Sequence, residues 1–255
     1  MMTRLVAAIL LTGLTMPLSA FGAEVVTLCA DERNWYPFTY QEAKQAKGMH
    51  IDIVTKALES LRYEFTITPL PRKRCLINVQ NGETDGMISV AYDPELAETL
   101  DYPADAVTTQ ESHARMMQVD HVVVTARDDP YEFEGDLTSL PLPVRIPAGE
   151  VVTERLRQAG LRVEEVKTDE QNFQKLLRDQ QGVIITTSVI AETMNQRPEY
   201  AGKFTIHATP LISQSYHLVF SKKAPLSPEQ KQAVWDAITT WREDYVFMLQ
   251  VFAQY

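Results

Sequence analysis

Hydrophobic and polar residues change period several times along the chain, and these changes mark the predicted elements. Residues 24–30 are rich in β-branched and apolar side chains and predict a first strand. The next periodic segment has four aliphatic residues at helical spacing: Ile51, Val54, Leu58 and Leu61. Residues 63–70 then alternate between apolar and polar side chains, as a half-buried strand does. Because strands and helices follow one another in turn, the pattern predicts an α/β fold with a mostly parallel sheet.

A second helix and strand follow directly. Pro71 suits the first turn of a helix because its missing N–H falls among the donors that have no partner there. Gly82 ends this helix, and the apolar run 87–91 predicts a buried strand after it. Ligands collect at the carboxyl ends of such strands, so Ser89 and Tyr92 are candidate ligand contacts. The alternative is that both are ordinary strand and loop residues.

The second half of the chain repeats this arrangement. Residues 173–189 have the same plan as residues 75–90, which is an amphipathic helix, a glycine stop and an apolar strand. Two such units favour two similar lobes over one long sheet. Helices are also predicted from Ser227, which opens a capping box, and from Tyr245. Further strands are predicted at residues 121–126, 144–146, 163–166, 204–210 and 215–221.

An aromatic loop follows the first predicted strand. Residues 31–40 are polar at first and then densely aromatic, and Pro37 interrupts regular structure there. Loops at strand ends carry binding residues more often than packing residues, so we expect these aromatic side chains to line a ligand cleft. The alternative is that they close the side of a core. The candidate contacts in this loop are Trp35, Tyr36 and Phe38.

The amino terminus has the pattern of a secretory signal peptide over residues 1–23. A basic start is followed by the apolar run 5–14, and small residues suit cleavage near Gly22 or Ala23. The apolar run is too short to span a bilayer, and no longer apolar run follows it. We therefore expect an exported, periplasmic protein without a membrane anchor of its own.

The charge and the histidines exclude several classes of partner. The formal net charge is −10 at pH 7, which disfavours nucleic acid and anionic membrane surfaces. No two histidines stand at the short spacing of metal ligands, so we expect no metal and no cofactor. The five histidines are His50, His113, His121, His207 and His217.

Cys29 and Cys75 are the two cysteines of the chain. An oxidising compartment favours a disulfide between them. The alternative is a pair of buried free thiols. A metal site is less favoured, since no histidine lies close to either cysteine in the sequence.

Several short motifs, in this order, resemble one known family. They are the aromatic sequence Trp35-Tyr36-Pro37-Phe38, the helix start Gly48-Met-His-Ile-Asp52, and the segment from Leu76 to Gly82 followed by Asp85-Gly86. Behind a signal peptide, they resemble the periplasmic solute-binding proteins of family 3, the polar amino-acid-binding type of ABC importers.

The resemblance implies a two-lobed fold of the type II periplasmic-binding-protein kind. In it, two mostly parallel sheets are joined by two crossover strands, and the lobes close on a ligand like a hinge. By position, the crossovers fall near residues 117–122 and 211–216. Lobe one is then residues 24–119 plus 214–255, and lobe two is residues 120–213.

Two departures from the family pattern bear on the ligand. Members that bind amino acids usually have an arginine for the ligand α-carboxylate shortly after the serine-rich strand, but residues 93–97 contain no basic residue. The lobe-two acid that usually binds the α-amino group falls near Thr186 and Thr187, which are neutral. A hydroxyl does not replace a bidentate arginine–carboxylate pair. The sequence therefore argues against a free α-amino acid held in the usual way.

Other basic residues are candidates for the missing positive charge. Arg72 opens a predicted helix, where a cation opposes the helix dipole and so favours an anion nearby. The alternative is that the three consecutive bases at this point form a solvated helix start. Arg115, just before the first crossover, is a second candidate. The lobe-two residues expected to contact the ligand are Gly149, Thr186 and Thr187.

The leading hypothesis is a monomeric, non-enzymatic binding protein that closes on a small polar or anionic solute and presents it to an ABC importer. One alternative is an orphan sensory subunit that signals to a membrane receptor, which needs the same closing lobes. A less favoured alternative is a dehydratase-type enzyme on the same scaffold. No nucleophile elbow or phosphate-binding glycine loop supports an enzyme.

Overall fold

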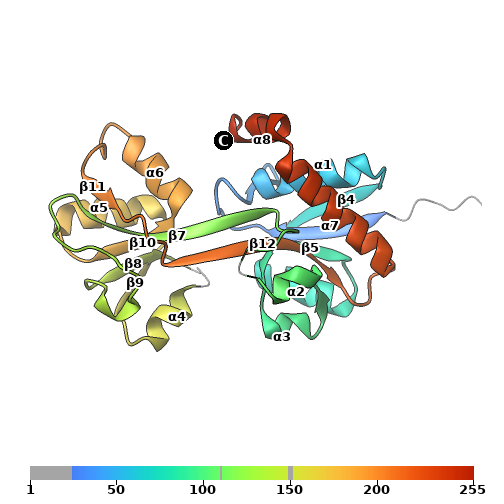
Figure 1. Cartoon of the computed structure of the whole chain (residues 1–255), viewed down its shortest axis with the longest axis horizontal. Helices are drawn as coiled ribbons and strands as arrows, with labels where there is room; N and C mark the ends of the chain where they lie inside the picture. The colour runs from blue at the N-terminus through green and yellow to red at the C-terminus, as the bar shows by residue number, and fades with distance from the viewer. Residues whose placement is uncertain (1–24, 110, 149–151) are drawn as a thin grey trace, which may run out of the picture.

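The computed structural model describes residues 25–109, 111–148 and 152–255. The chain forms two lobes that lie side by side, with two long strands running between them (Figure 1). These strands are β7 (Met117–Ala126) and β12 (Ile212–Ser221). The chain passes from lobe one to lobe two along β7 and returns along β12. The predicted signal peptide, residues 1–23, lies outside the described residues.

Lobe one is built on three parallel strands. Both β4 (Phe65–Leu70) and β5 (Gly86–Ala91) pair in parallel with β1 (Val26–Asp31). Helices cover both faces of this sheet, with α1, α7 and α8 on one side and α2 and α3 on the other (Figure 1). These helices are α1 (Met49–Ser60), α2 (Arg72–Asn81), α3 (Pro94–Ala97), α7 (Pro228–Glu243) and α8 (Tyr245–Phe252). Short elements complete the lobe: β2 (Tyr40–Glu42), β3 (Gln45–Lys47), β6 (Leu100–Asp101) and the 3-10 helix η1 (Ala104–Val107).

Lobe two has a smaller sheet around the far half of β7. Its strands are β8 (Val144–Pro147), β9 (Val163–Val166), β10 (Val183–Thr187) and β11 (Phe204–Ile206). Its helices are α4 (Val152–Gln158), α5 (Asp169–Asp179), α6 (Ser188–Gln196) and the 3-10 helix η2 (Leu137–Ser139). In this lobe β8 pairs in parallel with β9 and β10, and β10 and β11 pair antiparallel with β7.

The two lobes share one path of hydrogen-bonded strands, in the order β4-β1-β5-β12-β7-β10-β8-β9. The join is an antiparallel ladder of β7 and β12 that runs from Met117 opposite Tyr216 to His121 opposite Ile212. The predicted two-lobed α/β fold with two crossover strands is therefore confirmed, and its two sheets meet in this ladder. The ladder lies within the segments predicted as crossovers, while the exact lobe boundaries stay a prediction.

The strand register brings the carboxyl ends of both sheets toward the same place. In lobe one, β5 ends at Ala91, which pairs with Tyr216 in the ladder. In lobe two, β10 ends at Thr187, which pairs with His121 at the other end of the ladder. Ligands of open parallel sheets bind outside the carboxyl ends of the strands. The interlobe region is therefore where a ligand site is expected.

Local sequence signals explain where several elements begin and end. Gly82 follows α2 with φ 80°, a left-handed conformation that glycine adopts readily. Ser227 and Gln230 form a capping box at the start of α7. One boundary differs from the prediction, because the strand expected to reach residue 189 ends at Thr187. There the Thr187 hydroxyl accepts the N–H of Ile190 and starts α6 instead.

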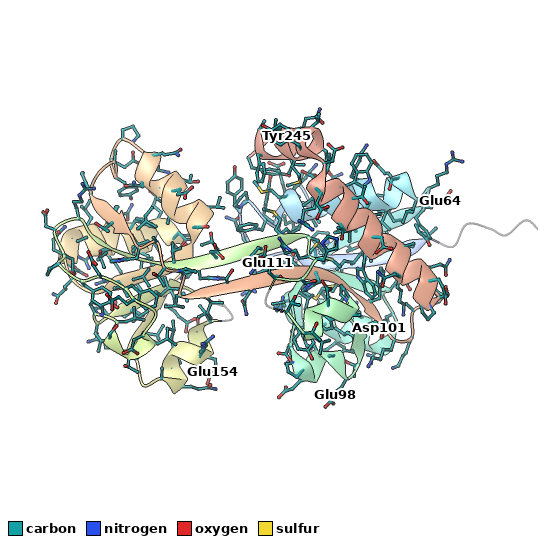
Figure 2. All side chains as sticks on the ribbon, in the orientation of Figure 1. Glu64, Glu98, Asp101, Glu111, Glu154 and Tyr245 are labelled. Carbon is teal, nitrogen blue, oxygen red and sulfur yellow. A yellow bond between two sulfur atoms is a disulfide. The ribbon has the colours of Figure 1, made fainter. Side chains whose placement is uncertain are left out.

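A disulfide joins Cys29 on β1 to Cys75 on α2, as predicted. Their Cα atoms are 5.8 Å apart, and both residues are fully buried. Apolar side chains from β5, β12 and β6 surround the bond. Within the described residues, no helix is both long enough and apolar enough to cross a membrane. On the outer side of lobe one, Tyr245 opens α8 at the surface (Figure 2).

Candidate functional site

A hollow of about 400 Å³ lies at the carboxyl edge of lobe one. One wall is the loop that follows β1, and the other is the first turn of α2. Three of the lining side chains are cations and one is an acid. The lining residues are Glu32, Arg33, Pro71, Arg72, Lys73 and Leu76. Their excess of positive charge, in an acidic protein, makes this hollow suited to an anionic group.

The two arginines of the hollow differ in their partners. Arg33 is bound to Asp31, whose carboxylate lies 2.8 Å from Arg33 Nε and 2.7 Å from Nη2. Arg72 is half-buried, and within the described part of the chain its guanidinium makes no hydrogen bond or ion pair. It is also the first residue of α2, after Pro71, which has no side-chain cap to offer. A cation opposes the dipole at a helix amino end, so Arg72 is left poorly compensated unless an anion binds.

The disulfide fixes the two walls of this hollow relative to each other. Cys29 lies two residues before the end of β1, just ahead of the loop that carries Arg33. Cys75 lies three residues after Arg72 on α2. The bond therefore holds the start of α2 against the end of β1.

Arg72 also belongs to a group of tyrosines at the end of β5. The Tyr102 hydroxyl donates to the Ala91 carbonyl at 3.1 Å, and the Tyr92 ring packs edge-on against Tyr102 at 5.3 Å. Burial and the charge of Asp93 raise the pKa of Tyr102, and the charge of Arg72 acts against this rise. Arg72 is therefore within electrostatic reach of the β5 end, where Tyr92 was predicted to meet a ligand. No pattern in the sequence marked Tyr102 as part of the site.

The aromatic loop divides into residues with different environments. Trp35 is half-buried and packs against Tyr216, with the ring centroids 4.9 Å apart. Phe38 is only 1 % exposed and belongs to the lobe-one core. The structure thus corrects the prediction that Phe38 contacts a ligand, because the alternative of core packing applies to it. Tyr36 donates its hydroxyl to the main-chain oxygen of Tyr255.

Ser89 also turns away from the interlobe region. It has φ 68°, and its Oγ lies 2.7 Å from Nδ1 of His50 inside the lobe. Burial lowers the pKa of His50 to about 3, so the imidazole is neutral. The Ser89 hydroxyl therefore makes an internal hydrogen bond, and its contact with a ligand stays a prediction. Sequence reasoning missed His50, although the residue stands inside the helix-start motif that begins at Gly48.

Arg115 is already engaged within lobe one. Its Nη1 donates to the Ser112 carbonyl at 2.6 Å, and its Nη2 pairs with Glu111 at 2.8 Å. Arg242 of α7 donates to the Arg115 main-chain oxygen at 3.0 Å. These contacts hold the guanidinium near the start of β7, and its role as the ligand cation stays a prediction.

The predicted lobe-two contacts have local partners. The Thr186 hydroxyl donates to Asp169, and the Thr187 hydroxyl caps α6. Both threonines are buried at the carboxyl end of β10, beside the ladder. Each hydroxyl therefore makes one local bond and keeps capacity for another, and the contact of both threonines with a ligand stays a prediction. Gly149 lies outside the described residues.

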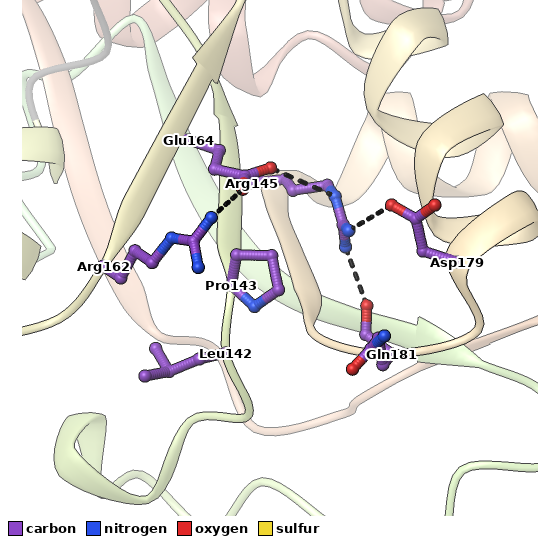
Figure 3. A pocket seen from close by; sticks show the side chains of 7 residues that line it. All are labelled: Leu142, Pro143, Arg145, Arg162, Glu164, Asp179 and Gln181. Carbon is purple, nitrogen blue, oxygen red and sulfur yellow. Dashed lines mark hydrogen bonds and ion pairs between the residues drawn. The ribbon is translucent and has the colours of Figure 1, made fainter.

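A second hollow, of about 330 Å³, lies at the amino ends of the lobe-two strands, away from the interlobe region (Figure 3). Arg145 of β8 is only 1 % exposed there, and its Nη2 pairs with Asp179 at 2.7 Å. Its Nη1 donates to the Gln181 carbonyl at 2.8 Å, and its Nε lies 3.8 Å from Glu164. The buried guanidinium of Arg145 is thus bound by its own lobe at Nη1 and Nη2.

Among the described residues, no cluster of three or more histidine, cysteine, aspartate or glutamate side chains is arranged to hold a metal ion. The groups that the fold brings to the interlobe edge of lobe one are Trp35, Arg72, Tyr92 and Tyr102. This set combines aromatic and phenolic surfaces with Arg72, whose guanidinium has no hydrogen bond or ion pair among the described residues. It is suited to binding a small polar molecule that carries an acid.

Solved structures with the same fold are numerous, and their sequences are distant. The GluR0 ligand-binding core in complex with L-glutamate is 15% identical, with a TM-score of 0.68 over 91% of this chain and 98% of that chain. ArtJ, the arginine-, lysine-, histidine-binding protein of Geobacillus stearothermophilus, is 15% identical, with a TM-score of 0.63 over 91% of this chain and 94% of that chain. AncCDT-1, an ancestral amino acid-binding protein and precursor of cyclohexadienyl dehydratase, is 14% identical, with a TM-score of 0.61 over 90% of this chain and 94% of that chain.

Comparison with curated protein sequences finds no match. A family model does match, over residues 27–244, and this range includes both lobes and the ladder between them. The resemblance seen in the sequence motifs is therefore confirmed. The chain belongs to the bacterial extracellular solute-binding proteins, family 3.

Proposed function

We propose that this protein binds a small, acid-bearing solute between its lobes in the periplasm and presents it, as a monomer, to the permease of an ABC importer. The observation that carries this proposal is Arg72, a half-buried cation with no hydrogen bond or ion pair in the described part of the chain. Its hollow lies at the carboxyl edge of lobe one, where ligands of such sheets bind. Family membership supports solute binding as the general role.

The chemistry of the edge favours a carboxylate over a complete α-amino acid. A guanidinium forms two parallel hydrogen bonds with a carboxylate, and Arg72 has its fork free for this. An α-ammonium group needs an acid, and the acid at the lobe-two edge, Asp169, already accepts the hydroxyl of Thr186, while Thr187 is neutral. Trp35 adds an aromatic face two residues after Arg33. We therefore propose a dicarboxylate-like solute without an α-ammonium group.

Thermal-shift measurements with succinate and with free amino acids test this proposal. A ligand at 100 times its dissociation constant stabilises the native state by about 2.7 kcal/mol. At roughly 2–4 °C per kcal/mol for a chain of this size, the melting midpoint rises measurably. We expect a rise with succinate and none with arginine, glutamine or histidine. A large rise with any of these three amino acids overturns the proposed ligand class.

A matched pair of variants isolates Arg72. Arg72→Ala removes the unpaired guanidinium, and Lys73→Ala removes the neighbouring exposed cation of the same helix turn. A charge-assisted hydrogen bond contributes about 1.5–3 kcal/mol, so succinate affinity falls by roughly 10-fold to 100-fold in Arg72→Ala. Lys73→Ala changes it by much less. Equal losses in both variants mean that only the general positive field matters, which contradicts the proposed role of Arg72.

The sensory alternative shares the lobes and the site with the transport role, and only the partner differs. A strain that lacks this protein is expected to lose uptake of the solute that the thermal screen identifies. Normal uptake with a lost transcriptional or motile response favours the sensory subunit. Turnover of that solute by the purified protein favours the dehydratase-type alternative, for which AncCDT-1 is the structural parallel.

A further inference from the structure

Tyr255 connects two parts of lobe one that are far apart in the sequence. Its main-chain oxygen accepts the hydroxyl of Tyr36 from the aromatic loop. Its own hydroxyl donates to Oδ2 of Asp52 at 2.7 Å, in the first turn of α1. Its ring packs edge-on against Tyr36 at 6.1 Å and Tyr40 at 6.3 Å. The residue therefore bonds to both ends of the segment from Tyr36 to Asp52.

That segment is also tied to α1 from its other side. The N–H of Met49 donates to the Pro37 carbonyl at 2.9 Å, and the N–H of His50 donates to the Phe38 carbonyl at 3.1 Å. The aromatic loop thus lies between the first turn of α1 and Tyr255. Loss of the Tyr255 contacts therefore removes the support of the loop on the side facing away from α1.

The bond between Tyr255 and Asp52 has the character of a strong, charge-assisted hydrogen bond. Burial and the hydrogen bond with Asp52 raise the pKa of Tyr255, so the phenol keeps its proton and remains a donor. Burial raises the pKa of Asp52, and the hydrogen bond from Tyr255 counters that rise by stabilising the carboxylate. Hydrogen bonds from a neutral hydroxyl to a carboxylate are short and strong.

We propose that Tyr255 is a positioning residue of the solute site, holding the aromatic loop so that Trp35 stays packed on Tyr216. Trp35 directly precedes Tyr36, so the hydroxyl bond of Tyr36 fixes the main chain beside the indole. The consequence for solute affinity rests on the proposed function. The consequence for the loop does not, because it follows from contacts within lobe one alone.

The test follows the indole N–H signal of Trp35 by NMR in the full chain, assigned with Trp35→Phe. The variants are Tyr255→Ala and Tyr255→Phe. The control is Tyr245→Ala, which removes a tyrosine of the preceding helix that is 76 % exposed (Figure 2). The internal reference is Trp235, whose indole donates to the Leu218 carbonyl at 2.8 Å in the core.

We expect Tyr255→Ala to shift and broaden the Trp35 signal while the Trp235 signal and the Tyr245→Ala spectrum stay as in the wild type. Tyr255→Phe keeps the ring contacts with Tyr36 and Tyr40 and loses only the bond to Asp52, so it gives a smaller change. Succinate affinity falls by about fivefold to tenfold in Tyr255→Ala, the size of one lost hydrogen bond. A purely structural role predicts a lower melting midpoint with an unchanged Trp35 signal.

Two results overturn the proposal. One is a Trp35 signal in Tyr255→Ala that matches the wild type. The other is an altered signal with unchanged succinate affinity. If succinate does not bind the wild type, the ligand class proposed above fails, and the Trp35 signal still decides whether Tyr255 positions the loop.

Discussion

The hollow in lobe one and the hollow in lobe two each contain an arginine, and the two arginines differ in whether the fold pairs their charge. In lobe two, the guanidinium of Arg145 is buried and bound to Asp179, Glu164 and a carbonyl (Figure 3). In lobe one, Arg72 is half-buried and has no such partner in the described part of the chain. The lobe-two hollow lies at the amino ends of its strands, and the lobe-one hollow lies at the carboxyl ends. A cation whose charge is neutralised by the fold stabilises the fold, whereas a cation left without a partner at a ligand-binding edge is available to a ligand.

The two hollows are also held together by different bonds. A covalent disulfide fixes the walls of the lobe-one hollow, while ion pairs hold the lobe-two hollow. In the described part of the chain, Arg72 forms no ion pair with the residues around it. The disulfide therefore holds the walls of the lobe-one hollow in place. Variants that remove the disulfide or one of the two arginines distinguish a role in stabilising the fold from a role in binding a ligand.

Removal of the disulfide is expected to have the largest effect. In Cys29→Ala/Cys75→Ala, the bridge over a sequence separation of 46 residues is lost, which costs about 4 kcal/mol in the chain-entropy model. The free energy of unfolding from denaturant titration measures this loss. Succinate affinity is also expected to fall, because the start of α2 loosens from the end of β1. Reductant provides the control, since it lowers the stability of the wild type and leaves the double variant unchanged.

Removal of the paired arginine is expected to come next. Arg145→Ala removes a buried side chain together with its hydrogen bond to the Gln181 carbonyl, which costs about 3 kcal/mol, the size of a large-to-small substitution in a core. The two acids add little to this cost, because Asp179 keeps Arg178 and Glu164 keeps Arg162 as partners. The melting midpoint falls by roughly 10 °C. Arg162→Ala, which removes an exposed neighbour, changes it little, and a loss of succinate affinity in Arg145→Ala beyond that of partial unfolding contradicts the comparison.

Some features of these hollows could be predicted from the sequence alone, and others could not. The helix and strand around Gly82 were predictable because a glycine stop and an apolar run are local signals. The disulfide was predictable from compartment and cysteine count. The interlobe edge followed from the family resemblance together with the rule for carboxyl ends of parallel strands.

Side-chain directions were not predictable in the same way. Ser89 looked like a ligand contact because it stands near a strand end, but its positive φ turns it toward His50. Phe38 and Arg115 were predicted as ligand contacts from their places in the aromatic loop and before the first crossover, and their observed partners come from the core or from residues distant in the chain. The pairing of Arg145 likewise depends on an α5 residue brought close only by the fold. Periodicity carries no information on such tertiary contacts.

A pH titration extends the comparison to a buried group without a counter-charge. Burial lowers the pKa of His50 to about 3, below its ordinary value of 6.5, and no carboxylate contributes to this pKa. As pH falls below 6.5, the unfolded chain binds a proton at His50 that the folded chain does not bind. The contribution of the neutral imidazole to the free energy of unfolding is therefore fully present above this pH and is lost as the pH falls toward 3. Between pH 6 and 5 this residue lowers the free energy of unfolding by about 1 kcal/mol per pH unit.

His50→Gln is therefore expected to reduce the slope of the free energy of unfolding against pH by that amount. A slope remains, because burial also lowers the pKa of His217 to about 4. His113→Gln is the control, since that side chain is 74% exposed. An unchanged slope in His50→Gln means that the imidazole takes up a proton in the folded state, and the neutral ring assigned to it is wrong.

The smallest expected effect has the opposite sign and bears most directly on the comparison. Arg72→Ala, without solute, removes a cation from the amino end of α2 that the fold does not pair. Relief of this unfavourable interaction with the helix dipole raises the free energy of unfolding by about 0.3–1 kcal/mol at low ionic strength. High salt screens the dipole and removes the gain. A loss of stability in this variant, comparable to that in Arg145→Ala, means that Arg72 is a structural cation like its lobe-two counterpart. In that case Arg72 is not held available for an anionic solute. The proposed role is supported if the gain disappears in high salt and if succinate makes the wild type more stable than Arg72→Ala.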